Sequence, residues 1–137
     1  MAVFQLEIVT PTGILYDGAV ERLRAPGSEG GFGVLANHQP MLVSLRVGAF
    51  LFVEENGEAR EAATSGGFLE VRSNRVTVLA ETAELSDQID VDRARASRGR
   101  ALERLSQKRD LDIDFLRATA ACSRARNRLC VAGMEGN

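Results

Sequence analysis

The chain has 137 residues, of which 45% are hydrophobic and 26% are charged, and its formal net charge is -2. This balance is typical of a folded globular protein and excludes a disordered or fibrous chain. No apolar run approaches the roughly 18 residues needed to span a bilayer, and the N-terminus lacks the pattern of a signal peptide, so we expect the chain to stay in the compartment where it is made.

Residues 1–86 carry the pattern of short strands. Phe4, Leu6 and Ile8 alternate with polar residues, which is typical of a half-buried strand. Asn56-Gly57 predicts a type I′ hairpin turn, because both residue types tolerate a positive φ. A second hairpin is predicted across 72–75, and no helical period separates these strands. The pattern therefore favours an antiparallel sandwich or barrel.

The composition changes near residue 86. Residues 1–86 contain six arginines, no lysine and eleven acidic residues, a net charge of -5, whereas residues 87–137 contain ten arginines, one lysine and eight acidic residues, a net charge of +3. All three prolines and ten of the thirteen glycines lie in the first part. Since turns are concentrated before this point and helices are permitted after it, we predict two domains, 1–86 and 87–137.

Two helices are predicted in the second part. Apolar residues that repeat at intervals of three, four and seven form a stripe on each helix: Val91, Ala94, Ala101, Leu102 and Leu105 on the first, and Phe115, Ala118, Cys122, Ala125 and Leu129 on the second. Asp87 or Asp90 is the predicted N-cap of the first helix, and 108–112 is the predicted turn. Because both stripes are narrow and rich in alanine, we expect the helical hairpin to depend on the first domain or on another protein for stability.

Cys122 and Cys130 lie eight residues apart on the second predicted helix. That spacing is about 12 Å along the helix axis, which is too long for a disulfide. We expect both to be small buried apolar residues, and two cysteines with a single histidine make a poor set of metal ligands.

Four arginines are predicted to share a face of the helical hairpin. Arg93 and Arg100 are seven residues apart on the first helix, and Arg124 and Arg128 are four apart on the second. If the helices pair antiparallel, the early part of the first lies beside the late part of the second, and the four guanidinium groups can converge. Such a cluster normally has an anionic partner, and the planar donors of arginine fit phosphate oxygens.

Three interpretations of these arginines stay open on composition and spacing alone. The first is a solvated basic face with local ion pairs to Asp90, Asp92 and Glu103. The second is a nucleic-acid-binding helix, against which stand the acidic first part and the lack of aromatic stacking residues. The third is a small phosphorylated ligand between the helices, for which Asp90 and Glu84 could accept hydrogen bonds from a ribose hydroxyl or an exocyclic amine.

No catalytic arrangement is evident in the sequence. His38 is the single histidine, and no nucleophile has a base at a recognisable spacing. Gly30, Gly31 and Gly33 are interpreted as part of a turn in a β domain rather than as a phosphate loop.

Four segments carry a resemblance to a known family: GGFGVLANHQPML at 30–42, SGGFLEV at 65–71, ELSDQIDVDRARA at 84–96 and the end of the chain from 127 to 134. In this order they resemble the epsilon subunit of the rotary F-type ATP synthase, essentially from end to end. The IDxxRA element resembles the bacterial members whose C-terminal hairpin binds ATP. Ala36, where proline is common in the family, and Gln39, where a small residue is frequent, are departures from the pattern.

The resemblance implies an all-β sandwich of about ten strands followed by an α-helical hairpin. It implies a rotor part of a proton-translocating complex and not a catalyst, with the gamma subunit and the membrane ring of small subunits as partners. It also implies a peripheral location on the cytoplasmic face of the bacterial membrane, and no nucleic-acid partner. Glu29 and His38 would face the membrane ring.

The same resemblance implies a regulatory ATP site, with neither hydrolysis nor a metal. Its expected contacts are Glu84, Ile89, Asp90, Arg93, Ala94, Arg100, Arg124 and Arg128. Arg100, Arg124 and Arg128 would hold the phosphates, and Ile89, Asp90 and Ala94 would lie near the adenine. The hairpin would either fold against the sandwich, a form that ATP stabilises, or extend to the catalytic alpha and beta subunits and inhibit ATP hydrolysis.

Overall fold

The computed structural model describes residues 2–106 and 112–133, with only the backbone described at 106 and 112–116. The chain divides into two compact units, Met1–Leu85 and Ser86–Asn137, close to the division after residue 86 that the composition suggested.

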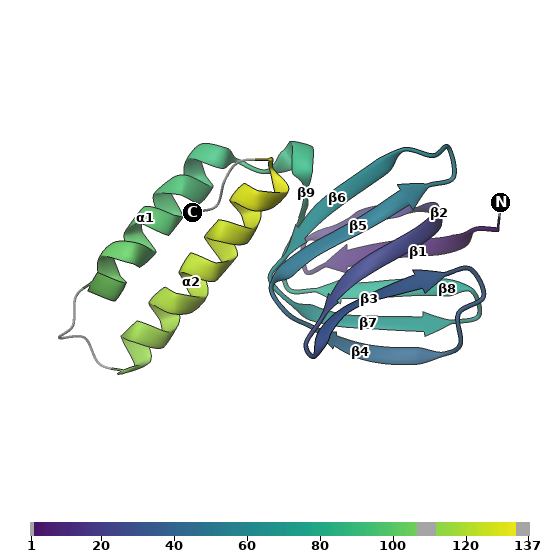
Figure 1. The fold of residues 1–137 in the computed structure, drawn as a ribbon, viewed down its shortest axis with the longest axis horizontal. Helices are drawn as coiled ribbons and strands as arrows, with labels where there is room; N and C mark the ends of the chain where they lie inside the picture. The colour runs from purple at the N-terminus through teal and green to yellow at the C-terminus, as the bar shows by residue number, and fades with distance from the viewer. Residues whose placement is uncertain (1, 107–111, 134–137) are drawn as a thin grey trace. The chain divides into compact units, whose positions relative to one another are not determined.

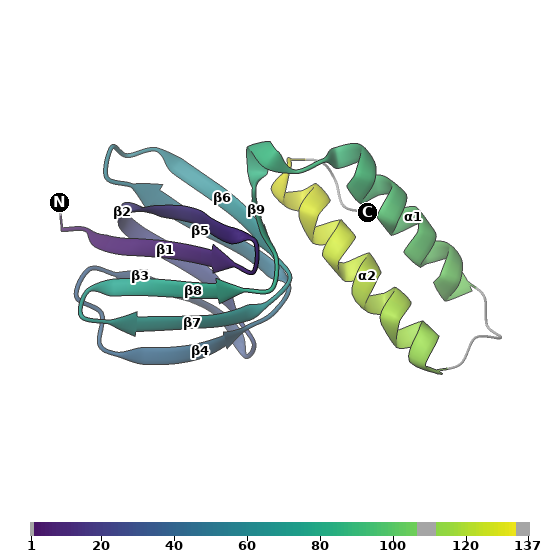
Figure 2. The ribbon, with the colours of Figure 1, turned by 180° about the vertical axis from the view of Figure 1, so that it is seen from behind.

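The first unit consists of nine described strands. They are β1 (Phe4–Thr10), β2 (Gly13–Gly27), β3 (Gly30–Leu35), β4 (Met41–Leu45), β5 (Gly48–Glu54), β6 (Ala59–Thr64), β7 (Gly67–Arg72), β8 (Arg75–Ala80) and β9 (Ala83–Leu85). Their order is β1-β8-β7-β4-β2-β5-β6-β9, with β3 paired to β2, and β1 also paired to β2. The pairing of β1 with β8 is parallel and the others are antiparallel. The predicted β-sandwich is confirmed (Figures 1 and 2).

Strand β2 joins the two layers of the sandwich. It has 15 residues, and its first half pairs with β1 from Gly13 to Val20. Its second half pairs with β3 on one side and β5 on the other, and Gly27 pairs with Leu45 of β4. A register shift between Val20 and Arg22 marks the change of partner. One strand therefore takes part in both layers.

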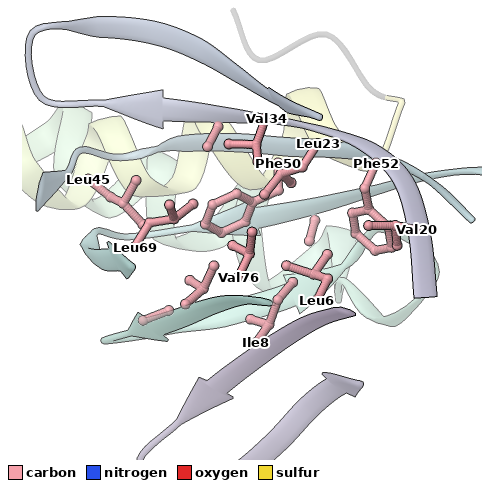
Figure 3. Close-up of a cluster of buried hydrophobic side chains, with 14 of the residues drawn as sticks. Leu6, Ile8, Val20, Leu23, Val34, Leu45, Phe50, Phe52, Leu69 and Val76 are labelled. Carbon is pink, nitrogen blue, oxygen red and sulfur yellow. The ribbon is translucent and has the colours of Figure 1, made fainter. Parts of the chain in front are cut away.

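The sandwich core follows from the alternation of apolar residues in the strands. Phe4, Leu6 and Ile8 are all buried, as the period of two predicts. The core also contains Phe50 and Phe52 of β5, which are among the largest fully buried side chains. Figure 3 shows Leu6, Ile8, Phe50 and Phe52 among the labelled side chains of this cluster, and all members of the cluster come from residues 4–85. The first unit thus has a hydrophobic core of its own.

The hairpin across 72–75 is confirmed, whereas the turn at Asn56-Gly57 differs from the sequence-based expectation in type. Between β5 and β6 only Gly57 has a positive φ, of 87°, while Asn56 accepts a hydrogen bond from the backbone N–H of Glu58 through its side chain. The turn is therefore a longer one with a single left-handed glycine, and the predicted type I′ turn is wrong here. The two-residue turn with positive φ at both positions lies instead at Ser73 and Asn74, between β7 and β8.

The second unit contains a short 3-10 helix, η1 (Ser86–Gln88), and two α-helices, α1 (Val91–Ser106) and α2 (Asp112–Val131). The helices lie side by side and antiparallel, so the start of α1 lies beside the end of α2 in both views (Figures 1 and 2). Asp90 is the N-cap of α1, because its Oδ1 accepts a hydrogen bond of 3.0 Å from the backbone N–H of Arg93. Most of the predicted turn at 108–112 lies outside the described residues.

The buried faces of the helices follow the spacing, except that Val91 and Leu105 are only half-buried and Leu102 is exposed. Ala94 and Ala101 of α1 are buried, and so are Ala118, Cys122, Ala125 and Leu129 of α2. Leu102 is 40% exposed, because it follows Ala101 by one position and is rotated about 100° from the buried face. Cys130 follows Leu129 in the same way and is exposed, so the expectation that both cysteines are buried is wrong for Cys130. The side chain of Phe115 lies outside the described residues.

None of the helices among the described residues is long and apolar enough to cross a membrane.

Candidate functional site

Four of the predicted ATP contacts surround the start of α1. Ile89 and Ala94 are buried, and Asp90 and Arg93 are exposed. Asp90 has one carboxylate oxygen engaged as the N-cap, and the backbone N–H of Ala94 donates to the carbonyl of Asp90. Asp90 therefore caps the first turn of α1 and is also a predicted ATP contact.

Each of the four arginines among the predicted ATP contacts stands one position before a buried residue. Arg93 precedes Ala94 and Arg100 precedes Ala101, while on α2 Arg124 precedes Ala125 and Arg128 precedes Leu129. Each is therefore rotated by about 100° from the inward direction, in the same sense along its own helix. In an antiparallel pair, an equal rotation on both helices leads to the same side of the pair. Helix geometry thus places all four arginines on one side of the helical hairpin.

The spacing along the helices is compatible with one extended anion. Arg93 and Arg100 are separated by about 10.5 Å of helix rise, and Arg124 and Arg128 by about 6 Å. Between the two rows lie small side chains, namely the half-buried Ser97 and Ala121. Ser97 is four residues from Arg93 and three from Arg100, so it shares their stripe. The sequence-based site did not include its hydroxyl, which the same helical spacing would have identified.

Two further arginines lie on this side of the hairpin. Arg104 precedes the half-buried Leu105, and Arg117 precedes the buried Ala118. Both are exposed and lie toward the other end of the helical pair, away from Asp90. The basic side is therefore longer than the predicted site, whereas Arg95 and Arg126, each of which follows a buried alanine, lie on the opposite side.

The arginines on this side of the hairpin differ in their contacts. In the described part of the chain, the side chains of Arg93, Arg100 and Arg124 have no carboxylate partner. The local pairs to Asp90 and Asp92 expected for such a face are thus missing at these positions. Glu103 and Arg128 do have interactions of their own.

Glu84 belongs to the other unit. It lies in β9, where it pairs with Ala63 of β6, and it is half-buried. Its role at the ATP site stays a prediction.

The two residues predicted to face the membrane ring lie at opposite ends of one strand. Glu29 is exposed in the turn before β3, and His38 is half-buried in the turn after it. The six residues of β3 that separate them span about 20 Å. His38 donates from its backbone to the carbonyl of Leu35, and its ring Nδ1 lies 2.8 Å from the carbonyl oxygen of Gln39. A backbone carbonyl thus provides a hydrogen-bond partner for one ring nitrogen of His38. The role of His38 at an interface stays a prediction.

Within residues 2–106 and 112–133, no group of three or more histidine, cysteine, aspartate or glutamate side chains could hold a metal ion.

Comparison with known proteins gives matches over both units. Residues 3–86 match the family described as ATP synthase, Delta/Epsilon chain, beta-sandwich domain, and residues 87–133 match the family described as ATP synthase, Delta/Epsilon chain, long alpha-helix domain. The ATP synthase epsilon chain of Nitratidesulfovibrio vulgaris (strain DP4) is 47% identical over 128 residues, which cover 93% of this chain and 94% of the relative. The ATP synthase epsilon chain of Halalkalibacterium halodurans is 44% identical over 133 residues, covering 97% and 99%.

Two solved structures share the fold. A chain in the cryo-EM structure of the Euglena gracilis mitochondrial ATP synthase, OSCP/F1/c-ring, has a TM-score of 0.78 at 22% identity and covers 90% of this chain and 77% of its own length. A chain in the central stalk/c-ring structure of the Tetrahymena thermophila mitochondrial ATP synthase has a TM-score of 0.59 at 16% identity, with 93% and 95% covered. At these identities the likeness concerns the fold alone.

Proposed function

Because the chain belongs to the ATP synthase delta/epsilon family, we propose that it is the epsilon subunit in the central stalk of a bacterial F-type ATP synthase, with a structural and regulatory role and no catalysis of its own. The proposal is supported by relatives named ATP synthase epsilon chain that match both the sandwich and the helical hairpin. Its partners are the gamma subunit and the membrane ring, and its place is at the cytoplasmic face of the membrane.

The regulatory part of the proposal is that the paired form of the hairpin binds ATP. The observation that carries it is the row of four arginines, each one position before a buried residue, on one side of the helical pair. These guanidinium groups fit the phosphates, because planar forked donors form charge-assisted hydrogen bonds with phosphate oxygens. The free carboxylate oxygen of Asp90 is suited to accept a hydrogen bond from an amine or a ribose hydroxyl.

Binding of ATP to the paired form alone would shift the hairpin toward that form. At a ligand concentration a hundredfold above Kd, the stabilisation is about 2.7 kcal/mol. The buried face between the helices consists largely of alanine, so the pairing energy that ATP must supplement is small. When ATP is scarce, the hairpin would open and its basic residues would reach the catalytic alpha and beta subunits, which would inhibit ATP hydrolysis. The bound ATP is a signal in this scheme and is not hydrolysed, and no metal is required.

Isothermal titration of the full chain with ATP tests the site. We expect Arg100→Ala and Arg124→Ala each to weaken ATP binding by roughly 10-fold to 150-fold, the loss of one charge-assisted hydrogen bond of about 1.5–3 kcal/mol. The matched control is Arg95→Ala with Arg126→Ala, which removes two arginines from the opposite side and should change the Kd by less than about twofold. No ATP binding at millimolar concentration, or equal losses in the site and control variants, would reject the ATP site and leave the central-stalk assignment standing.

A further inference from the structure

A serine hydroxyl lies next to the row of arginines on α1. Ser97 is near the middle of this helix, four residues after Arg93 and three before Arg100. At about 100° per residue, its direction differs from that of Arg93 by about 40° and from that of Arg100 by about 60°. In both cases the difference is toward the buried face marked by Ala94 and Ala101. The exposed arginines of α1 therefore have a half-buried serine beside them, closer to the partner helix.

The hydroxyl of Ser97 has no hydrogen-bond partner among the described residues. A serine inside a helix often donates to the carbonyl four residues earlier, which here belongs to Arg93, but the side chain of Ser97 does not form this bond. The oxygen is also open to solvent, since in the described part of the chain no buried side-chain oxygen lacks a partner. A half-buried donor is therefore available to a ligand.

The equivalent position on α2 carries no polar group. Ala121 is three residues after the buried Ala118 and three before Arg124, just as Ser97 is three residues after a buried alanine and three before an arginine. Both positions are half-buried, and helix geometry directs both to the same side of the antiparallel pair. Their small side chains leave space between the two arginine rows. Of the two residues, only Ser97 can donate a hydrogen bond into that space.

A neutral hydroxyl complements the charged donors around it. The side chains of Arg93, Arg100 and Arg124 have no carboxylate partner among the described residues, so no such carboxylate competes with an anion for them. The hydroxyl adds one more donor without adding charge to a cluster whose members already repel one another. Because Ser97 is half-buried, water competes for its hydrogen bond less than on an open surface.

We infer that Ser97 is a direct phosphate contact, whose Oγ–H donates a hydrogen bond to a phosphate oxygen held between the two arginine rows. The inference rests on the proposed function, because it adds a residue to the ATP site proposed above. It makes recognition of the phosphates depend on a neutral donor as well as on charge. Removal of this hydroxyl should therefore weaken every ligand that carries the phosphates, whether or not it carries a base.

Isothermal titration of the full chain with ATP and with inorganic tripolyphosphate tests this contact. Tripolyphosphate carries the phosphates without the base and the ribose. We expect Ser97→Ala to weaken the binding of both ligands about 10-fold, through the loss of one hydrogen bond to a charged group. Ser97→Thr, which keeps the hydroxyl, should bind both ligands much as the natural chain does.

Ser123→Ala is the matched control. Ser123 is exposed and follows the buried Cys122, so it lies on the side of Arg95 and Arg126, away from the proposed site. Its replacement should change neither affinity by more than about twofold. Alanine is a better helix former than serine, so neither alanine variant should melt at a lower temperature than the natural chain. A more stable paired form would bind ATP more tightly, which is opposite to the effect expected of Ser97→Ala.

The outcomes separate this inference from the proposed function. If the natural chain binds neither ATP nor tripolyphosphate at millimolar concentration, the proposed ATP site fails and the contact of Ser97 fails with it. If Arg100→Ala weakens ATP binding and Ser97→Ala does not, the contact of Ser97 alone is overturned. A loss confined to ATP would assign the hydroxyl to the ribose or the base and would overturn the phosphate contact. An equal loss in Ser123→Ala would overturn it by showing a general effect on the helices.

Discussion

Asp90 combines two requirements in one side chain. As the N-cap of α1 it satisfies the backbone N–H of Arg93, and as a proposed ATP contact it offers its second oxygen to the ligand. The sequence alone predicted both roles, because an aspartate directly before a helical stripe is a common cap and the IDxxRA element resembles ATP-binding relatives. What the sequence could not decide was the choice between Asp87 and Asp90, since that depends on where the backbone enters the helix.

The two roles of Asp90 can be separated by substitution. Asp90→Asn keeps a good N-cap and removes the charge, whereas Asp90→Ala removes both. We expect Asp90→Ala to destabilise the hairpin by about 1 kcal/mol and Asp90→Asn to have little effect on stability, as measured by circular dichroism of the full chain during heating. Both should weaken ATP binding in calorimetry. Normal ATP binding by Asp90→Asn would remove the carboxylate from the proposed site.

Glu61 provides a pH-dependent test of the sandwich. Partial burial raises the pKa of the Glu61 carboxyl above its ordinary value, so the fold favours its protonated form. The protonated Glu61 carboxyl therefore contributes fully to the stability of the fold below the ordinary pKa of about 4.3. This contribution is lost as the pH rises through the higher pKa of the folded state. Glu61→Gln should raise the melting temperature at pH 7 and leave it nearly unchanged at about pH 3.5. A difference that is the same at both pH values would show that charge is not the cause.

At the scale of elements, periodicity predicted which faces are buried but not where the buried face stops. The stripes through Ala94, Ala101, Ala125 and Leu129 were correct, because spacings of three and four identify one helix face. The prediction that Leu102 is buried was wrong, because in the sequence an apolar residue next to a buried alanine cannot be distinguished from a core residue. The predicted turn type at Asn56-Gly57 was wrong for a related reason: Asn-Gly also suits a longer turn, and only the strand register shows which one forms.

Two glycines, one in a helix and one in a strand, predict opposite changes in stability when they are replaced by alanine. Gly99 lies in α1, where a Cβ atom would meet nothing within 4 Å, so Gly99→Ala should stabilise the hairpin by about 0.5–1 kcal/mol. Gly67 begins β7 with a φ of +144°, and a Cβ atom there would collide with the carbonyl of Leu79. Gly67→Ala should therefore destabilise the sandwich by about 2 kcal/mol or more. Denaturant unfolding of the full chain measures both, and destabilisation by Gly99→Ala would contradict the exposed helical position.

At the scale of the whole molecule, the sequence predicted two domains and their classes because the change in glycine, proline and charge at residue 86 is sharp. It could not predict a hollow of about 720 Å3 on the outer face of the sandwich, over β3, β2 and β5 and near the start of β6. That surface brings together residues from four strands, and only the pairing of β2 with both β3 and β5 places Arg22 and Arg24 between Leu35 and Leu51. The interpretation of Gly30, Gly31 and Gly33 as turn residues was wrong, because all three belong to strand β3.

The separate core of the sandwich predicts that a chain ending at Ser86 folds without the hairpin. Because the buried cluster is built wholly from residues 4–85, this shortened chain should unfold in a single cooperative transition. When it replaces the full chain in the assembled ATP synthase, ATP hydrolysis at low ATP should be faster if the hairpin inhibits. An unchanged hydrolysis rate would argue against inhibition by the hairpin, and a failure to fold would show that the sandwich needs it.

The passage of β2 from one layer of the sandwich to the other has a mechanical consequence. Any sliding of the two layers past each other would have to break hydrogen bonds along a single continuous strand that is paired with β1, β3 and β5 in turn. The sandwich should therefore resist shear and rotate as a rigid body, so that a torque applied to one layer is transmitted to the other.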